Sequence, residues 1–311
     1  MSLPRFPTAP DATFHLAHPF ETMGGVEAFE AGPMAQLRAA FPDLERRETI
    51  RMRGVSNLGG DWIGTCGYWC GTFAAPFLDI PPTRRMAHMR FHEFRRVEDG
   101  RVVEFQGLWD IPELMMQAGA WPMGPSLGRE WHVPGPATQD GLHIEGDGAR
   151  AAELVTRMLT NLGNNEDGEA AMKLDEAWHP AMSWYGPAGI GTARGIAGFR
   201  RHHQIPFLNA MPDRVGDPAA GHLFAQGDYV GFTAWPGMHM TLDGDGWLGI
   251  VPAGKRITMR SLDFWRAASC EESEQPDGRY LLVENWVLVD LLHVWHQLGV
   301  DVLARMRELT A

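Results

Sequence analysis

The sequence is poor in cysteine and has none of the cysteine spacing that marks a redox or zinc motif. Its 311 residues include only 3 cysteines, Cys66, Cys70 and Cys270, an odd number that argues against a disulfide framework. Cys66 and Cys70 lie four positions apart, which differs from the Cys-x-x-Cys spacing of a redox or zinc motif. We therefore expect all three to be small buried side chains.

Positive charge and long apolar runs are also scarce. Lys and Arg number 27 against 39 Asp and Glu, a net charge of −12, and no basic patch is visible. An acidic surface repels phosphate groups, so we expect no nucleic acid and no membrane as partner. The longest apolar stretches have about ten residues, whereas a bilayer span needs about 20. Pro4, Pro7 and Pro10 are not typical of a secretory signal, and we expect a cytoplasmic protein.

The residues that are present fit a folded chain of two domains. Apolar residues make up 44% and charged residues 21%, which is enough apolar surface to build cores. A length of 311 residues corresponds to two domains at about 150 residues each. The 12 Trp and 17 Met are many for this length, and such side chains line ligand cavities as well as cores.

Several segments recur in the same order along the chain. GVEAF and MRFHEFRR, beginning at residues 25 and 89, match GIAGF and MRSLDFWR at an offset of 170, and DWIG at 61 matches DYVG at an offset of 167. Near the end of each copy the offset grows to 180, with ten extra residues assigned to a hairpin connection at 269–278. The residues matched at 180 are Glu104, Leu108, Asp110, Gln117 and Gly119 with Glu284, Leu288, Asp290, Gln297 and Gly299. The sequence therefore predicts a tandem duplication of one globular domain.

The expected domain boundaries follow from this repeat. A stretch at 122–147 contains Pro122, Pro125, Pro134 and Pro136 and is typical of a linker. The first domain is then 1–121 and the second 148–311. The second begins with a predicted helix at 149–162, for which the first copy has no room, so its N-terminal helix is expected to be shortened or absent.

The order of elements in the second copy predicts an α+β fold. Apolar spacing favours a helix over 196–211, kinked or broken at Pro206. Strand-like segments follow at 221–226, 229–235, 256–266 and 280–289, and a final helix is expected at 291–309. A helix set followed by a run of antiparallel strands places the helices on one face of a curved sheet.

The phrases EFQGLWDIPELMMQAG and ENWVLVDLLHVWHQLG carry the pattern Glu-x5-Asp-x6-Gln-x-Gly in both copies. With the order of elements, this pattern resembles the SnoaL-like polyketide cyclase family of the nuclear transport factor 2-like superfamily. The resemblance implies two tandem cone-shaped barrels, each a curved, mostly antiparallel sheet wrapped on helices around an apolar pocket. It also implies cofactor-independent intramolecular aldol ring closure. The superfamily contains isomerases, dehydratases and non-catalytic domains as well. The alternatives are therefore a non-catalytic ligand-binding or assembly module of the same fold, or a related isomerase or dehydratase.

The resemblance places the family's acid/base aspartate at Asp290, and at Asp110 in the first copy. On a strand, Trp286, Leu288 and Asp290 share one face, so the Asp290 carboxylate is expected to face the pocket beside Trp286. Partial desolvation there would raise its pKa toward the range useful in proton transfer. The alternative is an N-cap of the final helix, and the two roles are compatible.

Other polar and aromatic residues are candidates for binding the ligand. In the second copy they are His179, Trp184, Tyr185, His203, Trp235, His239, Arg260, Glu284 and Trp286, together with His202 and Asp263. In the first copy they are His18, Trp62, Tyr68, His88, Arg90, His92 and Glu93. Each has surface or core hydrogen bonding as its alternative role. Arg260 and Asp263 are three apart on a strand, so at most one of them should face the ligand.

The expected ligand is a hydrophobic carbonyl-containing small molecule, with no cofactor. His293 and His296 lie three apart on the final helix but lack a third ligand of matching spacing, so no metal site is expected. The two copies are expected to pack as an intrachain pseudo-dimer through their sheet faces. Further homo-oligomerisation is left open.

Overall fold

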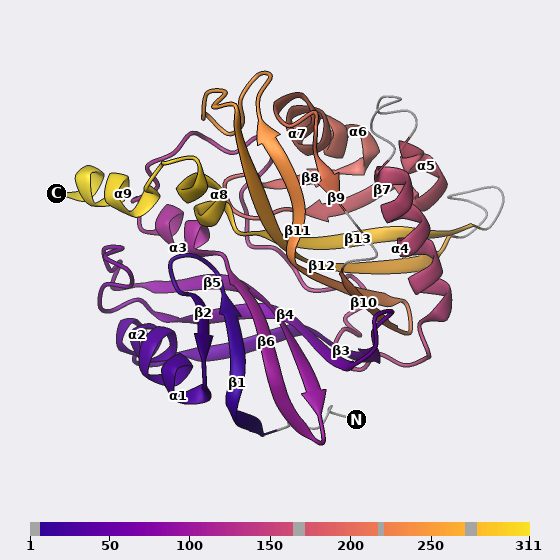
Figure 1. The fold of residues 1–311 in the computed structure, drawn as a ribbon, viewed down its shortest axis with the longest axis horizontal. Helices are drawn as coiled ribbons and strands as arrows, with labels where there is room; N and C mark the ends of the chain where they lie inside the picture. The colour runs from indigo at the N-terminus through magenta and orange to yellow at the C-terminus, as the bar shows by residue number, and fades with distance from the viewer. Residues whose placement is uncertain (1–6, 164–171, 217–220, 271–278) are drawn as a thin grey trace.

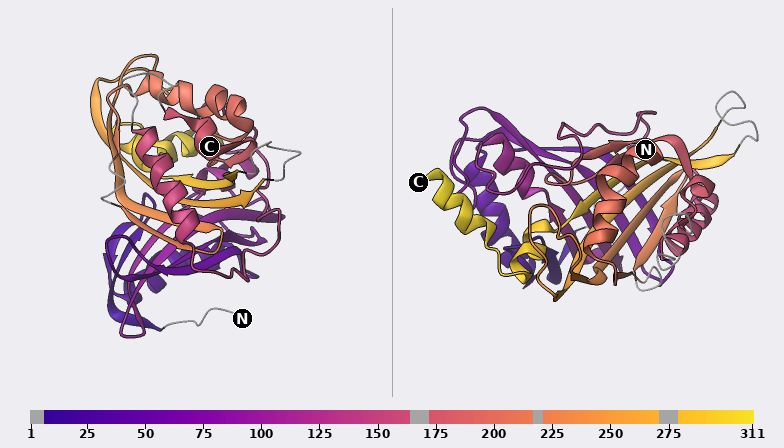
Figure 2. Two further views of the ribbon diagram at one scale, coloured as in Figure 1. Left: turned by 90° about the vertical axis from the view of Figure 1, so that its right-hand side faces the viewer. Right: turned by 90° about the horizontal axis from the view of Figure 1, so that it is seen from above.

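The computed structural model describes residues 7–163, 172–216, 221–270 and 279–311, which form two sheets with helices against each (Figure 1). The connection predicted at 269–278 lies almost wholly outside these residues. In the side view of Figure 2 the first half lies below the second, and their sheets approach each other between the two helical layers. None of the helices in the described ranges has the length and hydropathy needed to cross a membrane.

The first half is a six-stranded sheet with short helical segments on one side. A hairpin of β1 (Thr8–Leu16) and β2 (Glu21–Gly24) leads into α1 (Val26–Phe29), a π-helical segment (Glu30–Met34) and α2 (Ala35–Ala40). The remaining elements, in chain order, are β3 (Glu45–Val55), β4 (Asp61–Thr72), β5 (Met86–Glu98), β6 (Arg101–Trp109) and α3 (Ile111–Gln117). The strand order in the sheet is β2-β1-β6-β5-β4-β3, with only β1 and β6 parallel.

The second half repeats this arrangement after a helix, α4 (Ala149–Leu162), and a short turn of helix, α5 (Leu174–Ala177). Its elements continue as β7 (Trp178–Tyr185), β8 (Thr192–Arg194), α6 (Gly195–Phe199), a π-helical segment (Arg200–Gln204), α7 (Ile205–Ala210), β9 (Val215–Gly216), β10 (His222–Gln226), β11 (Tyr229–Leu242), β12 (Lys255–Ser269), β13 (Tyr280–Val289), α8 (Leu291–Gln297) and α9 (Val302–Thr310). The sheet order is β10-β11-β12-β13-β7-β8, with β9 also paired to β11 and only β13 and β7 parallel.

The two halves share strand order and individual hydrogen bonds. Asp43 accepts hydrogen bonds from the backbone N–H and hydroxyl of Thr72, and Asp213 does the same for Thr241. Gln117 bridges the backbone N–H and C=O of His88, and Gln297 bridges those of Thr258. The predicted α+β fold with mostly antiparallel sheets in tandem is therefore confirmed.

Individual elements depart from the predictions mainly at helix breaks. The helix predicted at 149–162 is observed, but the segment at 196–211 is divided into α6, a π-helical segment and α7, with Pro206 in the first turn of α7. The final helix is two helices, because the chain turns at Gly299 with φ 84° between α8 and α9. A positive φ is readily adopted by glycine and interrupts a helix.

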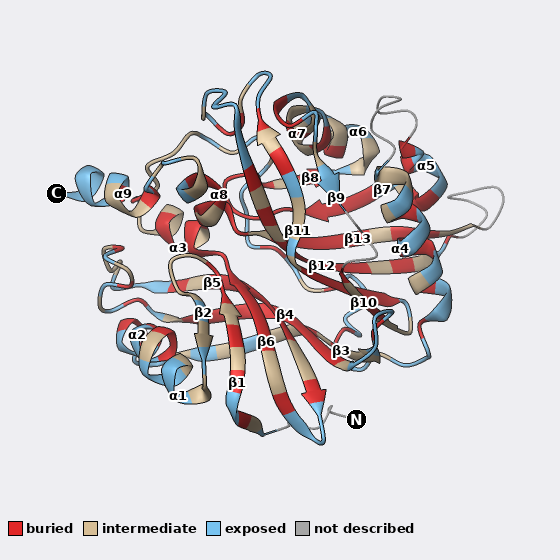
Figure 3. Ribbon diagram, in the orientation of Figure 1, coloured by how far each residue is buried: buried red, intermediate tan, exposed pale blue. Residues whose placement is uncertain are grey.

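One face of each sheet packs against the other sheet. Phe94 and Phe264, which occupy the same position in the two copies, stack with ring centroids 4.9 Å apart. His92 Nδ1 lies 2.8 Å from the carbonyl oxygen of Leu262 across the same contact. Figure 3 shows buried residues along the strands of both sheets in this region. Because helices cover the opposite faces, the central strands are buried on both sides.

Candidate active site

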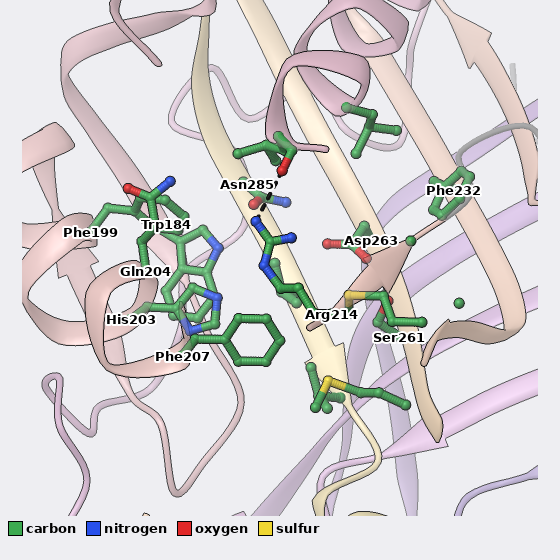
Figure 4. A pocket seen from close by; sticks show the side chains of 18 of the residues that line it. Trp184, Phe199, His203, Gln204, Phe207, Arg214, Phe232, Ser261, Asp263 and Asn285 are labelled. Atoms are coloured by element: carbon green, nitrogen blue, oxygen red, sulfur yellow. Dashed lines mark hydrogen bonds between the residues drawn. The ribbon is translucent and has the colours of Figure 1, made fainter. Parts of the chain in front are cut away.

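A cavity of about 200 Å³ lies in the second half, between its sheet and helices α4, α6 and α7 (Figure 4). Apolar and aromatic side chains make up most of its wall. The polar residues in the wall are His203, Gln204, Arg214, Ser261, Asp263 and Asn285. An apolar cavity with a few convergent polar groups is the usual form of a small-molecule site.

Asp263 is the carboxylic acid in this wall. It projects from β12 on the face that also carries Ser261 and Trp265, and the residue is only 9% exposed. Burial raises the pKa of Asp263 to about 7, while hydrogen bonding by the side chains of Asn285 and Ser261 acts in the opposite direction. Within the described ranges no Lys, Arg or His forms an ion pair with it. The carboxyl group can therefore both accept and return a proton near neutral pH.

An aromatic wall faces this carboxyl group across the cavity. His203 stacks on Trp184 with ring centroids 4.2 Å apart and an interplanar angle of 16°. The π-helical segment that carries His203 and Gln204 lies between α6 and α7, where its wider turn brings both side chains to the cavity. Burial, with the charge of Arg214 as a second cause, lowers the pKa of His203 to about 3, so the imidazole is neutral.

The position of Asp263 in the first half is taken by Glu93, 170 residues earlier, and its surroundings are different. The Glu93 carboxylate pairs with Arg46 at 2.8 Å and Arg95 at 2.5 Å, and it accepts a hydrogen bond from Trp109 Nε1. These arginines lower the pKa of Glu93 in spite of its burial. The guanidinium of Arg46 also lies 3.9 Å from the ring centroid of Phe91 and fills the space beside the carboxylate.

Strand register identifies what replaces the two arginines in the second half. In the first half, Arg46, Trp69 and Met89 are paired across strands β3, β4 and β5. In the second half, Gly216, Met238 and Met259 are paired across strands β9, β11 and β12. Arg46 is therefore equivalent to Gly216, which lines the cavity, and Arg95 is equivalent to Trp265 at the offset of 170. Loss of both cations leaves Asp263 without a charged partner and opens space next to it.

The placement expected for Asp290 is wrong: it does not line this cavity. Its carboxylate is buried where the two halves meet, accepting hydrogen bonds from the backbone N–H groups of His293 at 3.1 Å and of His18 at 3.0 Å, with Arg260 at 3.3 Å. It is thus the N-cap of α8, the alternative role, and it also joins the first half. Burial does raise the pKa of Asp290, as expected from desolvation.

Asp110 occupies the equivalent place in the first half. Its Oδ2 accepts a hydrogen bond from the backbone N–H of Ala188 in the second half at 2.9 Å and lies 3.4 Å from Arg90. Both aspartates therefore connect the halves, each contacting the loop after the first strand of the other half. The alternation along β13 correctly separates the face with Trp286 and Leu288 from the face with Asn285 and Val287. The first face was assigned to the pocket, whereas it forms the contact between the sheets, and the second face lines the cavity.

Of the nine predicted ligand-binding residues, the structure brings only Trp184 and His203 to the cavity. Tyr185 and Trp286 belong to the core between the halves, and Glu284 pairs with Arg266 at 2.6 Å. Arg260 pairs with Glu21 and Asp290, and its guanidinium lies 4.8 Å from the Trp235 ring centroid. His179 accepts from the backbone N–H of Ala181, and His239 is exposed on β11. As predicted, only one of Arg260 and Asp263 faces the cavity.

The family model of SnoaL-like polyketide cyclases matches residues 7–118. The first half of the chain is thus similar to this family over these residues. The second half repeats the strand order of the first. Similar solved structures include IdmH from Streptomyces antibioticus (27% identity, 36% of this chain and 82% of that chain, TM-score 0.31) and AclR from Streptomyces galilaeus (23%, 38% and 73%, 0.31). A SnoaL-like protein from Jannaschia sp. CCS1 is 23% identical over 35% of this chain and 72% of that chain, with a TM-score of 0.29. None of the curated proteins compared matches the chain.

Neither the cavity nor other parts of the described ranges gather three His, Cys, Asp or Glu side chains in a geometry that would hold a metal ion. All three cysteines are buried, as expected.

Arg214, Gln204 and Asn285 are site residues that the sequence analysis missed, and Asp263 was named there without being assigned the central role. Alignment of the two copies of the sequence does indicate this role of Asp263. Glu93 and Asp263 are both acidic, but Arg95 is replaced by Trp265, so an acidic residue has lost a nearby cation. The change at Gly216 requires the strand register and was not visible from the sequence.

Proposed function

We propose that the second half is an acid/base enzyme of the polyketide-cyclase type, in which Asp263 transfers a proton to and from a hydrophobic carbonyl-containing small molecule. The observation that carries this proposal is the buried Asp263 carboxyl group, with a pKa of about 7, in an apolar cavity and without a cationic partner among the described residues. A pKa near the working pH suits a group that must act first as base and then as acid.

The proposed reaction has three steps. The ionised Asp263 accepts a proton from the carbon next to a ligand carbonyl, and the C–H electron pair forms the enolate. The enolate carbon attacks a second carbonyl of the same molecule, so a C–C bond forms and the π pair of that carbonyl becomes an alkoxide. Asp263 then returns its proton to the alkoxide, and no net proton is gained or lost.

The cavity also supplies groups that favour the enolate. The indole Nε1 of Trp265, next to Asp263 on the same face of β12, is buried and has no hydrogen-bond partner among the described residues. A donor in an apolar cavity stabilises developing negative charge on oxygen more than it does in water. The aromatic wall of Trp184 and Phe207 excludes water and offers flat surfaces to an unsaturated ligand.

Proton exchange provides the test. The full chain in D₂O is expected to accelerate exchange at the acidic C–H bonds of 2-tetralone, measured by NMR. Asp263→Asn should lower the protein-dependent rate by about 10²–10⁴-fold. Asp290→Asn is the matched control, a buried aspartate on the opposite side of the same sheet, and should retain the rate. Full exchange by Asp263→Asn would remove Asp263 from the mechanism. Binding of the ketone with no exchange by the wild type would instead favour the non-catalytic ligand-binding alternative.

A further inference from the structure

The cavity contains a cation, Arg214, that pairs with no carboxylate among the described residues. Arg214 directly precedes β9, and its half-buried guanidinium extends toward the space between the Trp184 and Phe207 side of the cavity and Asp263 (Figure 4). One of its terminal nitrogens donates to the carbonyl oxygen of Leu162 at 2.9 Å. Its Nε is buried and has no partner among the described residues. The equivalent position in the first half, 170 residues earlier, is Leu44.

Other arginines with little exposure are paired with acids. Arg90 lies 3.4 Å from Asp110, Arg260 lies 3.3 Å from Asp290, and Arg266 lies 2.6 Å from Glu284. Arg46 and Arg95 share Glu93. Arg214 forms no ion pair within the described parts of the chain, and burial lowers its pKa. A guanidinium held partly away from water without an anion is costly, and an anionic ligand would remove that cost.

Three indole N–H groups of the wall are also available to acceptors on a ligand. The indole Nε1 groups of Trp178, Trp247 and Trp265 are buried without partners among the described residues, and all three residues line the cavity. Buried N–H groups are normally satisfied, so these donors favour a ligand with several oxygen atoms. A planar guanidinium in a mostly apolar wall matches a carboxylate, whose two oxygens accept its paired N–H groups.

We propose that the ligand of this cavity is a hydrophobic keto acid, whose carboxylate pairs with Arg214 while its enolisable carbonyl lies at Asp263. This inference rests on the proposed function, because it takes the same cavity as the reaction site. It adds that Arg214 determines specificity by selecting an acid over the corresponding ester. Asp263 and Arg214 form no ion pair, so one group is free for the reacting carbon and the other for the anion.

Binding of two matched probes tests the inference. Naphthalene-2-carboxylate and its methyl ester share a ring system and differ in charge, and titration is followed by quenching of tryptophan fluorescence and by calorimetry. The wild type is expected to bind the carboxylate about 10- to 100-fold more tightly than the ester. Arg214→Gln should abolish this preference while leaving ester affinity unchanged. Arg214→Lys, which keeps the charge but not the planar fork, should retain part of it.

Several results would overturn the inference. The first is equal affinity of the wild type for both probes, and the second is no binding of the carboxylate at millimolar concentration. The third is an equal loss of affinity for both probes in Arg214→Gln with an unchanged melting temperature. If Arg214→Gln does not fold, Arg214→Lys decides, because an unchanged preference for the acid over the ester in that variant would exclude a bidentate contact. Asp263→Asn separates the two proposals. It should retain preference for the carboxylate, so loss of ketone exchange and loss of acid selectivity are independent outcomes.

Discussion

The two halves place an acidic side chain at the equivalent point of their two sheets and surround it differently. In the first half Glu93 is held between Arg46 and Arg95, which lower its pKa and fill the space beside it. In the second half Gly216 and Trp265 stand at those positions, and the pKa of Asp263 rises to about 7 next to an open cavity. Charged neighbours, rather than the fold, thus decide the direction in which the pKa of this carboxyl group shifts.

The largest effect is expected when Asp263 is given two arginine neighbours like those of Glu93 in the first half. Gly216→Arg combined with Trp265→Arg should place two guanidinium groups beside Asp263, lower its pKa and fill the cavity. A β-carbon at residue 216 would have only Met238 Cγ at 3.4 Å as a close contact, so the backbone position accepts a side chain. Exchange of 2-tetralone protons should fall by about 10²–10⁴-fold, the contribution of the base. Retention of full exchange in a folded double variant would contradict the comparison.

The pH dependence of stability should have opposite signs for the two acids. The folded pKa of Asp263 is above its ordinary value of 3.8, so the folded state keeps a proton that the unfolded state loses. The free energy of unfolding should therefore fall between about pH 4 and pH 7, by about 4 kcal/mol for a three-unit shift. Glu93 has a lowered pKa, so its contribution is present above its ordinary value of 4.5 and is lost as pH falls through the folded value.

Urea unfolding between pH 3 and pH 8 measures both slopes. Asp263→Asn should flatten the decrease between pH 4 and pH 7 and make the protein more stable than the wild type at pH 8. Glu93→Gln should flatten only the acid limb. Identical pH profiles for the wild type and Asp263→Asn would show that the Asp263 pKa is not raised.

Removal of the Glu93 carboxylate should lower the free energy of unfolding without lowering the rate of proton exchange. Glu93→Gln leaves the guanidinium groups of Arg46 and Arg95 without their shared carboxylate, and we expect a loss of about 3 kcal/mol in the free energy of unfolding at pH 7. Exchange of ketone protons per folded molecule should be unchanged. A parallel loss of exchange would indicate that the first half takes part in the reaction.

The smallest effect concerns the N-cap residues of the last two helices, Asp290 of α8 and Asp301 of α9. Asp290→Ala removes an acceptor for the backbone N–H groups of both His293 and His18, whereas Asp301→Ala removes only the acceptor for Ala304. Each should lower the free energy of unfolding by about 0.5–2 kcal/mol, with Asp290→Ala at the upper end because it also loosens the contact between halves. Calorimetric melting of the two variants checks the order.

The sequence repeat was sufficient to predict the fold, because Asp, Gln and Gly residues with fixed roles recur at constant spacing. Asp43 with Asp213 and Gln117 with Gln297 indeed make the same hydrogen bonds in both halves. The site was harder to predict. Alternation separates the two faces of β13 but does not say which face is the cavity, since both are buried, and a pairing such as Arg46 with Glu93 joins strands far apart in the sequence.

The fusion of the halves has an evolutionary consequence at the contact between their sheets. In a homodimer with twofold symmetry each substitution occurs twice and must suit both copies. Here Arg90 donates to the backbone carbonyls of Tyr185 and Gly186, while the equivalent Arg260 pairs with the Glu21 carboxylate. A single chain that contains both partners thus lets each copy change its side of this contact independently of the other.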